Sequence, residues 1–410
     1  MEFEDLYAVP SRNGLNRPRR VRGAGFKMVN MGELFAHDRI WDQEMDRVPM
    51  DEAEQTDYGL AAGDLLFARQ SLVAAGTGKC SIVLGVSEPT TFESHIIRVR
   101  LNEKKVVPLF YYYYFASRIG KANIQSLVMQ VAAAGIRGSE LAKLKIPCPP
   151  MPTQHRIAAI LGAYDELIEN NERRIALLDE TARRLYKEWF VDLRFPGHEK
   201  VKISGSKPEG WTTQRLGEVA DVNATLIRRG EEPDTIKYVS IASVSKGTMH
   251  EMESMPFKDA PGRARRRVKD GDVIWSAVRP NLRGFALVLD PAPNLVVSTG
   301  FAVISPRTVP YSYLYQVVTT EDFIGYLINH TRGAAYPAVN AEDFENAKVL
   351  VPSETVLNQY HLLASDLLRM RGVLLESNAK LREARDLALP RLISGELDVS
   401  DLDIPTEALA

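Results

Sequence analysis

The stretch Gly63-Asp64-Leu65-Leu66-Phe67-Ala68-Arg69 occurs again, in kind, as Gly271-Asp272-Val273-Ile274-Trp275-Ser276-Ala277. The two copies lie 208 residues apart. In each copy a Gly-Asp pair precedes a short apolar run, which is typical of a turn that leads into a buried strand. A repeat at this distance predicts two copies of a whole domain, because solenoid repeats are only about 20–50 residues long.

Two further landmarks repeat in the same order. The stretch 141–149 matches 344–352 in kind at an offset of 203, and a glutamine follows each of them, at Gln154 and Gln359. Each glutamine opens a long, unbroken helical pattern. Three landmarks in one order at nearly one offset indicate that each half of the chain is a globular domain followed by a long helix.

Short apolar runs bounded by glycine, proline and asparagine predict strands in both halves, with helical segments between them. The expected fold class is therefore α+β, with two mixed domains and two long helices. The predicted order is a first globular domain over 1–152, a first long helix over 153–195, a linker over 196–207, a second globular domain over 208–356, a second long helix over 357–389 and a C-terminal tail over 390–410.

Both long helical patterns carry an apolar residue every 3.5 positions on average. Steps of four and three from Ile157 to Trp189 meet nine apolar residues out of ten, with Asn171 as the polar member, which is a heptad seam. Such a seam must be covered. An antiparallel pair of the two helices within one chain is the simplest arrangement, and a coiled coil that dimerises the chain is the alternative. The predicted seam residues are Ile157, Leu161, Tyr164, Ile168, Ile175, Leu178, Leu185, Leu363, Leu367, Met370, Leu374 and Leu381.

The composition is that of a water-soluble globular protein, with 45% apolar and 25% charged residues. No apolar run approaches the ~20 residues that a membrane-spanning helix needs. The acidic N-terminus lacks the basic and apolar parts of a secretory signal. Two cysteines, Cys80 and Cys148, exclude a disulfide framework and fit a reducing compartment. We expect a cytoplasmic protein without a membrane partner.

No catalytic or metal-binding motif is found. Residues 75–80 resemble a phosphate-binding loop, but Val73 stands where the first glycine is needed and Cys80 replaces the hydroxyl residue. The seven histidines show no metal-ligand spacing with a carboxylate. We therefore expect a binding or scaffolding protein with no cofactor and no metal, and not an enzyme.

The net charge of 51 minus 53, or −2, conceals clusters of basic residues on expected loops. Arginine and asparagine on accessible loops are the residue types that contact phosphates and read base edges. The alternative for any one cluster is an ordinary solvated surface or, for the small-residue loops 130–137 and 331–340, a tight structural loop. The candidates for DNA contact are Arg12, Arg17, Arg19, Arg20, Arg22, Lys27, Arg69, Lys79 and Arg137 in the first domain, and Arg263, Arg265, Arg266, Arg267, Lys269, Arg279, Asn281, Arg283, Arg332, Tyr336 and Asn340 in the second.

The sequence resembles the specificity (S) subunit of type I restriction-modification systems along nearly its full length. The likeness is carried by the repeated Gly-Asp stretches, by 146–174 around Gln154-His-Arg-Ile, by 185–196, and by 392–399. The second copy departs from the family pattern, because Val351-Pro-Ser-Glu stands where a Pro-Pro pair is usual, and this blurs the start of the second helix.

The resemblance implies two target-recognition domains in a pseudo-two-fold arrangement, separated by an antiparallel two-helix coiled coil. Each domain would read one half of a bipartite, asymmetric site in double-stranded DNA. Two methyltransferase subunits would dock, with or without two restriction subunits, and S-adenosylmethionine and ATP would belong to those partners. The location would be the prokaryotic cytoplasm, on the nucleoid through DNA. A DNA-binding scaffold without sequence preference is the competing hypothesis, and an enzyme that transfers methyl groups by itself is the third.

The length of the helices predicts a spacing. Residues 157–189 span about 48 Å at ~1.5 Å per residue. At ~3.4 Å per base pair, domains at the two ends of such a helix pair would sit roughly 14 base pairs apart, which predicts an unread spacer between two half-sites.

Overall fold

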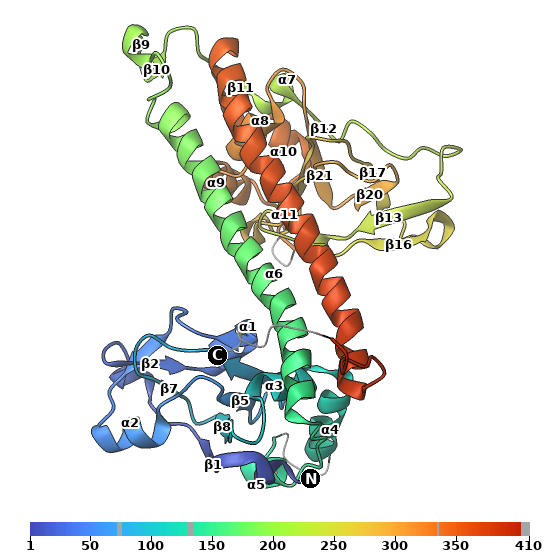
Figure 1. Ribbon diagram of the computed structural model, residues 1–410. Coiled ribbons are helices and arrows are strands. Elements are labelled where there is room, and N and C mark those ends of the chain that lie inside the picture. Colours follow the sequence, from blue (N-terminus) through green and yellow to red (C-terminus); the bar gives the residue numbers. More distant parts are fainter. Residues whose placement is uncertain (72–75, 130–134, 334–335, 403–410) are drawn as a thin grey trace. The chain divides into compact units, whose positions relative to one another are not determined.

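The computed structural model describes residues 1–71, 76–129, 135–333 and 336–402. The chain divides into two compact units. Unit 1 comprises Met1–Ile168 and the chain from Leu381 onward, and unit 2 comprises Glu169–Lys380. Both units are built from helices and sheets, which confirms the α+β fold class (Figure 1). No helix among the described residues is long and apolar enough to span a membrane.

Unit 1 contains two sheets, and most of their neighbouring strands are antiparallel. In the first sheet β3 joins β6 in parallel, and in the second β2 pairs antiparallel with β4 and parallel with β7. The first sheet has the order β1 (Tyr7–Asn13), β8 (Ile96–Leu101), β5 (Leu65–Ala68), β6 (Cys80–Val83) and β3 (Arg39–Ile40), and the second has the order β4 (Asp46–Val48), β2 (Phe26–Val29) and β7 (Thr90–Phe92).

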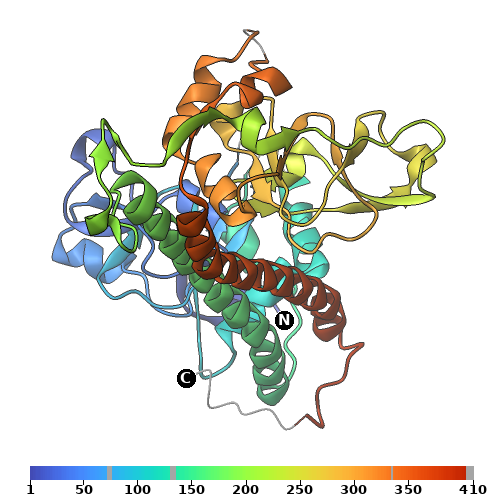
Figure 2. The ribbon, with the colours of Figure 1, turned by 90° about the horizontal axis from the view of Figure 1, so that it is seen from above.

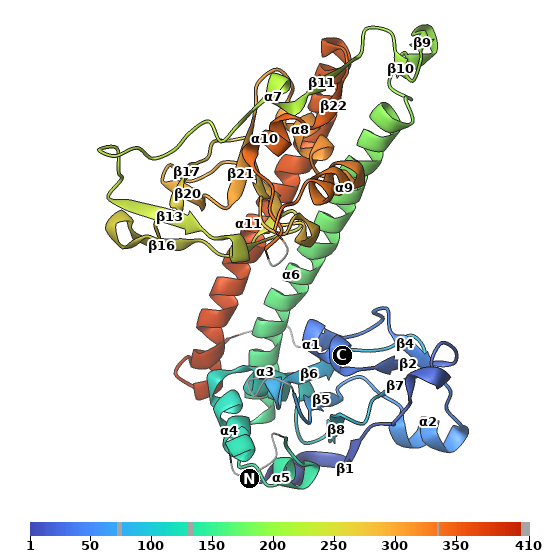
Figure 3. The same cartoon turned by 180° about the vertical axis from the view of Figure 1, so that it is seen from behind.

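Unit 2 also contains two main sheets. The first is wholly antiparallel, and in the second β13 pairs antiparallel with β16 and parallel with β20 (Figure 3). The first sheet has the order β12 (Ala220–Val222), β21 (Phe301–Pro306), β18 (Val273–Ser276) and β19 (Phe285–Leu287), and the second has the order β16 (Glu253–Pro256), β13 (Thr235–Val239), β20 (Leu295–Ser298) and β17 (Ala264–Arg267).

Seven strands of unit 1 have counterparts in unit 2. The order β1-β8-β5-β6 corresponds to β12-β21-β18-β19, and β4-β2-β7 corresponds to β16-β13-β20, with the same parallel and antiparallel pairings. Three helices follow the sheets in each unit: α3 (Pro108–Ala116), α4 (Arg118–Met129) and α5 (Gly138–Ala142) in unit 1, and α8 (Tyr311–Val317), α9 (Glu321–Asn329) and α10 (Ala341–Glu345) in unit 2. Unit 1 also contains α1 (Met31–Ala36) and α2 (Glu52–Tyr58), and unit 2 contains α7 (Leu216–Val219).

The repeated Gly-Asp pair has the same structural role in both units. Gly63 and Gly271 have φ of +82° and +84°, a region that glycine adopts without strain. The buried aspartate that follows accepts a hydrogen bond from a backbone N–H three residues earlier, at 2.8 Å for both Asp64 and Asp272. In unit 1 Asp64 also pairs with Arg100 at 2.7 Å. These turns begin β5 and β18, the fully buried central strands.

The long helices run slightly differently from the prediction. α6 (Met151–Tyr186) is followed by a π-helical turn, Lys187–Val191, so the helical run ends before the predicted residue 195. α11 (Glu354–Ser394) continues past the predicted end at 389, with Pro390 inside it. The reason is packing: Leu392 and Val399, beyond the proline, are buried in the core of unit 1. Burial of these side chains outweighs the missing N–H of the proline.

The seam of α11 differs from the predicted one. Leu363 and Met370 are 52% and 49% exposed, so their assignment to the seam is wrong. The buried positions are instead the next residues, Ala364 and Arg371. Each lies four residues after an inward position, at Tyr360 and Leu367, and a heptad seam allows steps of four as well as three. The remaining predicted seam residues are buried or half-buried: Ile157, Leu161, Tyr164, Ile168, Ile175, Leu178, Leu185, Leu367, Leu374 and Leu381.

Polar pairs occupy several inward positions of the helix pair, which Figure 2 views from above. In unit 2, Asn171 Nδ2 donates to Asn378 Oδ1 at 2.9 Å, and Asp179 pairs with Arg371. The partner number falls as the α6 number rises, so the helices are antiparallel there. In unit 1, Asp165 pairs with Arg385 at 2.6 Å. Polar seam residues fix the register of a helix pair.

Candidate nucleic-acid interface

A strained turn projects from the first sheet of unit 2. Between β18 and β19 the chain forms a short 3₁₀ turn, Pro280–Leu282, and the residues on either side of it, Arg279 and Arg283, have φ of +50° and +56°. Arginine rarely adopts this left-handed conformation, and such strain concentrates at functional sites. Arg283 is held by two hydrogen bonds of 2.7 Å to the carboxylate of Glu321 on α9.

A second loop lies beside this turn. The Arg279 backbone N–H donates to the Pro337 carbonyl at 2.7 Å, and Val278 forms an isolated bridge with Ala338. Arg332, at the start of this loop, makes two hydrogen bonds, at 2.7 and 3.0 Å, to Asp343 of α10. The hydrogen bond to Asp343 raises the pKa of Arg332. Both loops are thus anchored in the fold.

The outermost side chains of the two loops form one exposed surface, which we call the η8 surface after the 3₁₀ turn η8 (Pro280–Leu282). It consists of Arg279, Asn281, Leu282 and Tyr336. The Arg279 guanidinium lies 5.0 Å from the centre of the Tyr336 ring, and this ring is 71% exposed. Leu282 is 65% exposed. A cation, an amide, an aliphatic side chain and an aromatic ring together can contact both phosphates and base edges.

Asn340 has a structural role at the start of α10. Its side-chain oxygen accepts the Asp343 backbone N–H at 3.0 Å and caps α10. The cap uses only the side-chain oxygen of this exposed residue, so contact of the Asn340 Nδ2 with DNA stays a prediction.

The arginine cluster of unit 2 lies on strand β17 and the residues next to it, and its members differ. Arg266 is turned inward, where its guanidinium donates to the Asn223 side chain and the Phe301 carbonyl. Burial lowers the pKa of Arg266. Its predicted role in DNA contact is therefore corrected to a structural one.

The other members of this cluster stay partly or fully accessible. Arg265 lies 4.8 Å from the Phe257 ring centre, and Arg263 donates to the Tyr238 hydroxyl at 3.1 Å. Arg267 donates to the Glu231 carbonyl at 3.1 Å, and Lys269 is exposed. These four side chains can still approach phosphates.

Most of the basic segment of unit 1 is neutralised by acidic residues from elsewhere in the unit. The ion pairs are Arg12–Asp57 at 2.7 Å, Arg17–Glu54 at 2.5 Å, Arg22–Asp46 at 2.8 Å and Lys27 with Glu88 and Asp42 at 3.2 and 3.5 Å. Within the described part of the chain, only the side chains of Arg19 and Arg20 in this segment are exposed without an ion pair. The expected continuous positive loop is thus reduced to these two residues.

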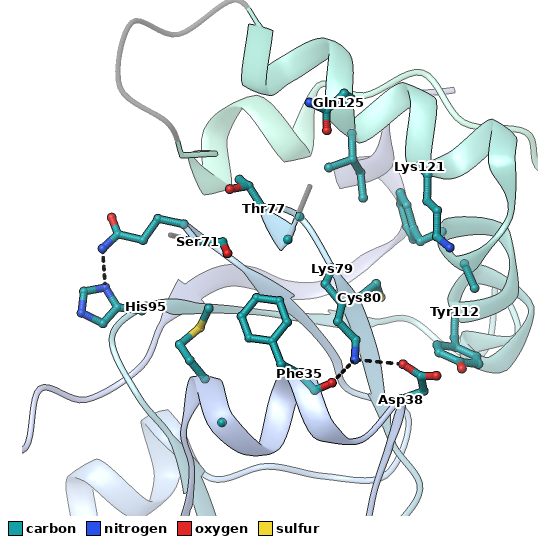
Figure 4. Close-up of a pocket in the computed structure, with 18 residues that line it drawn as sticks. Phe35, Asp38, Ser71, Thr77, Lys79, Cys80, His95, Tyr112, Lys121 and Gln125 are labelled. Carbon is teal, nitrogen blue, oxygen red and sulfur yellow. Dashed lines mark hydrogen bonds and ion pairs between the residues drawn. The ribbon is translucent and has the colours of Figure 1, made fainter. Parts of the chain in front are cut away.

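A cavity of ≈ 1090 Å³ lies at the end of β5 and β6 in unit 1 (Figure 4). Phe35, Tyr112 and Ile124 supply apolar walls, and Lys79 lies at 3.0 Å from Asp38 and donates to the Phe35 carbonyl at 2.8 Å. Thr77 is buried, and its hydroxyl has no hydrogen-bond partner among the described residues. Residues 72–75 of this connection, and 130–134 of the small-residue loop, lie outside the described residues.

The two remaining candidates of unit 1 stand next to this connection. Arg69 is half-buried at the end of β5, and its carbonyl accepts the Ile136 N–H at 2.8 Å. Arg137 is exposed at the start of α5. The β5–β6 connection and the loop before α5 therefore meet in unit 1 as the β18–β19 turn and the loop before α10 meet in unit 2.

Comparison with known proteins finds one family of similar sequences. Residues 48–180 match the model of the type I restriction modification DNA specificity domain. The chain is 25% identical over 312 residues to the type I restriction enzyme MjaIX specificity subunit of Methanocaldococcus jannaschii, which covers 72% of this chain and 71% of that protein. Residues 48–180 thus match a type I DNA specificity domain, and the chain is similar to type I specificity subunits over most of its length.

Further similar proteins are specificity subunits as well. The putative MjaX specificity subunit of the same organism is 24% identical over 376 residues, 86% of this chain and 82% of that protein. The crystal structure of the S subunit of a type I restriction-modification system from M. genitalium has the same fold, with a TM-score of 0.62 at 15% identity, covering 96% of this chain and 95% of that one.

Sequence reasoning missed Leu282. A search for basic residues passes over a leucine, although the pattern Arg-Pro-Asn-Leu-Arg indicates a turn in which an apolar residue has no core to enter. The signal available in the sequence was the position of a leucine in a turn between two arginines.

Proposed function

We propose that this specificity subunit directs a type I restriction-modification complex to a bipartite, asymmetric sequence in double-stranded DNA, with one half-site read by each unit. The strand-by-strand duplication carries this proposal, because two copies of one scaffold present loops at the same strand ends. The side chains on those loops differ, with Arg69 and Lys79 in unit 1 and Arg279, Asn281 and Arg283 in unit 2. Two copies of one fold that carry different loop side chains can read two different half-sites, which an asymmetric target requires.

The chemistry of the complex is assigned to other subunits. Methyl transfer and DNA cleavage would be performed by methyltransferase and restriction subunits, which would also hold S-adenosylmethionine and ATP. This chain would supply phosphate contacts through exposed arginines and base readout through its loop tips. The prokaryotic cytoplasm, on nucleoid DNA, is the location that fits this role.

The exposed side of α11 is the surface we propose for a methyltransferase subunit. Leu362, Leu363, Met370 and Val373 are all between 49% and 71% exposed in unit 2. At 3.6 residues per turn they fall within about 100° of the helix circumference, so they form one apolar strip. Apolar strips of this kind are typical of surfaces that bind another protein. Two methyltransferase subunits would bind the complete chain, with or without two restriction subunits.

The helix pair is the element that we propose sets the distance between the half-sites. Its register is fixed by polar pairs such as Asn171–Asn378, so the spacing would not drift.

Competition binding tests this function. The chain is assembled with its cognate methyltransferase subunit, and its affinity is measured for the methylated motif, for the motif with either half-site scrambled, and for a fully scrambled duplex. We expect specific binding that requires both half-sites. Equal affinity for all duplexes would favour a scaffold without sequence preference.

A further inference from the structure

We propose that Asn281 and Leu282 read one A·T base pair in the half-site of unit 2. Asn281 would bond to the adenine, and Leu282 would cover the C5-methyl group of the thymine. This inference rests on the proposed function, since it assigns a base pair to a surface that we have proposed to face DNA.

The first observation is the contrast in burial along the turn. Pro280 is buried, while the next two residues, Asn281 and Leu282, both project into solvent. Leu282 is 65% exposed although large aliphatic side chains are normally buried. A single exposed leucine needs no explanation by itself. Leu282, however, stands between two arginines in strained backbone conformations, and its exposure there does need an explanation.

The second observation is that the tip is held rigidly. Inside the turn, the Leu282 N–H donates to the Arg279 carbonyl at 2.9 Å, and the Arg283 N–H donates to the Pro280 carbonyl at 3.0 Å. At its base, the Ser276 N–H donates to the Gly284 carbonyl at 2.7 Å. A recognition element held in its bound shape loses little conformational entropy on binding.

The neighbouring arginines restrict what the tip can read. The Arg283 guanidinium is engaged by both oxygens of Glu321, so its bidentate donor face is occupied. Arg279 is stacked over Tyr336, where its charge stays accessible and suits a phosphate. Guanine is read chiefly by a free arginine or lysine, so within this turn these contacts leave Asn281 and Leu282 as the base-reading side chains.

The chemistry of the two side chains matches the major-groove edge of an A·T base pair. In the major groove adenine offers the N7 acceptor and the N6 donor, which an asparagine amide satisfies in bidentate geometry, and thymine offers its methyl group, which an apolar side chain covers. Asn281 and Leu282 are adjacent residues on one rigid turn, so the amide and the apolar group are presented together. No other base pair combines these features in that groove.

Base analogues test this assignment in the complex with the methyltransferase subunit. Each thymine of the unit 2 half-site is replaced in turn by deoxyuridine, which lacks only the methyl group. We expect one replacement to weaken binding of the unaltered complex about fourfold, the value for burying one methyl group. Leu282→Ala should weaken binding to the thymine duplex and remove the sensitivity to deoxyuridine at that position. Asn281→Ala should remove sensitivity to 7-deazaadenine in the same base pair.

The controls separate this inference from the proposed function. Met252→Ala removes another exposed apolar side chain of unit 2 and should keep the full sensitivity to deoxyuridine. A free energy of unfolding in urea that is unchanged from the unaltered chain shows that unit 2 of each variant is folded. Specific binding that is insensitive to every deoxyuridine, sensitivity that persists in Leu282→Ala, or a half-site without an A·T pair overturns the inference alone. If the unaltered complex binds specific and scrambled duplexes with equal affinity, the proposed function is overturned as well.

Discussion

Arg371 Nε on α11 lies 2.7 Å from Asp179 Oδ1 on α6, and the same guanidinium donates to the Gly247 carbonyl at 2.6 Å. Arg371 is only 4% exposed. Gly247 lies in the turn between β14 (Val244–Ser245) and β15 (Thr248–Met249), so one buried charge joins both long helices to the globular part of unit 2.

Arg371→Met is expected to destabilise unit 2 by about 3 kcal/mol, because it leaves the Asp179 carboxylate without its counter-charge. The double variant Arg371→Met with Asp179→Leu should recover most of this loss, since replacing both partners by apolar residues removes the unpaired charge. Urea denaturation of the full chain measures both. Equal destabilisation by the single and double variants would mean that the ion pair is not the cause.

Arg19→Ala with Arg20→Ala should weaken DNA binding without changing the bases recognised. Both side chains are exposed, and each neutralised phosphate contributes about one unit to the slope of log affinity against log salt, so the slope should fall by about two. Arg22→Ala is the matched control, because Arg22 is already paired with Asp46 and should leave the slope nearly unchanged. An identical slope in all three proteins would remove the η2 turn, Arg19–Val21, from the interface.

Arg266→Ala should lower the stability of unit 2, whereas Arg265→Ala, at the neighbouring residue, should weaken DNA binding. Loss of the inward guanidinium at 266 removes the donor to the Phe301 carbonyl and one of two donors to the Asn223 side-chain oxygen, which still accepts the Val303 N–H at 2.9 Å. The expected cost is about 1–3 kcal/mol of stability. Arg265→Ala should leave stability unchanged and weaken binding of the half-site read by unit 2. Thermal unfolding together with salt-dependent binding distinguishes them, and weakened binding with full stability in Arg266→Ala would refute the structural role.

Asp272 should make the stability of unit 2 depend on pH. Burial raises the pKa of this carboxyl, so the folded protein holds the proton to a higher pH than the unfolded chain, whose aspartate pKa is about 3.9. Between the two values the folded state binds more protons, and this contribution to stability is lost as the pH rises through the folded-state pKa. Asp272→Asn should abolish this slope, measured by urea unfolding from about pH 4 upward. Asp259→Asn, at an exposed site, should retain it; a slope unchanged in Asp272→Asn would contradict the assignment.

The duplication was predictable because the Gly-Asp turn and the strand after it depend on local sequence. Gly63 and Gly271 need a left-handed backbone, and their aspartates bond within three residues. The buried residues of α6 were predictable for the same reason, from the regular spacing of its apolar residues.

The long-range charge pairs were not predictable in this way. Apolar periodicity favoured Met370, whereas Arg371 is the buried residue because Asp179 faces it from a helix about 190 residues away in sequence. The basic segment 11–27 looked positive because Asp46, Glu54 and Asp57, which neutralise it, come from later elements. Such partners are set by the tertiary fold and not by neighbouring residues.

Methylome sequencing of cells that carry this chain with its cognate methyltransferase subunit tests the central claim most directly. We predict one asymmetric motif of two specified half-sites around an unspecified spacer, and a longer spacer when one helical turn is inserted into both α6 and α11. Methylation without a motif, a single continuous motif, or an unchanged spacer after the insertions would contradict the account.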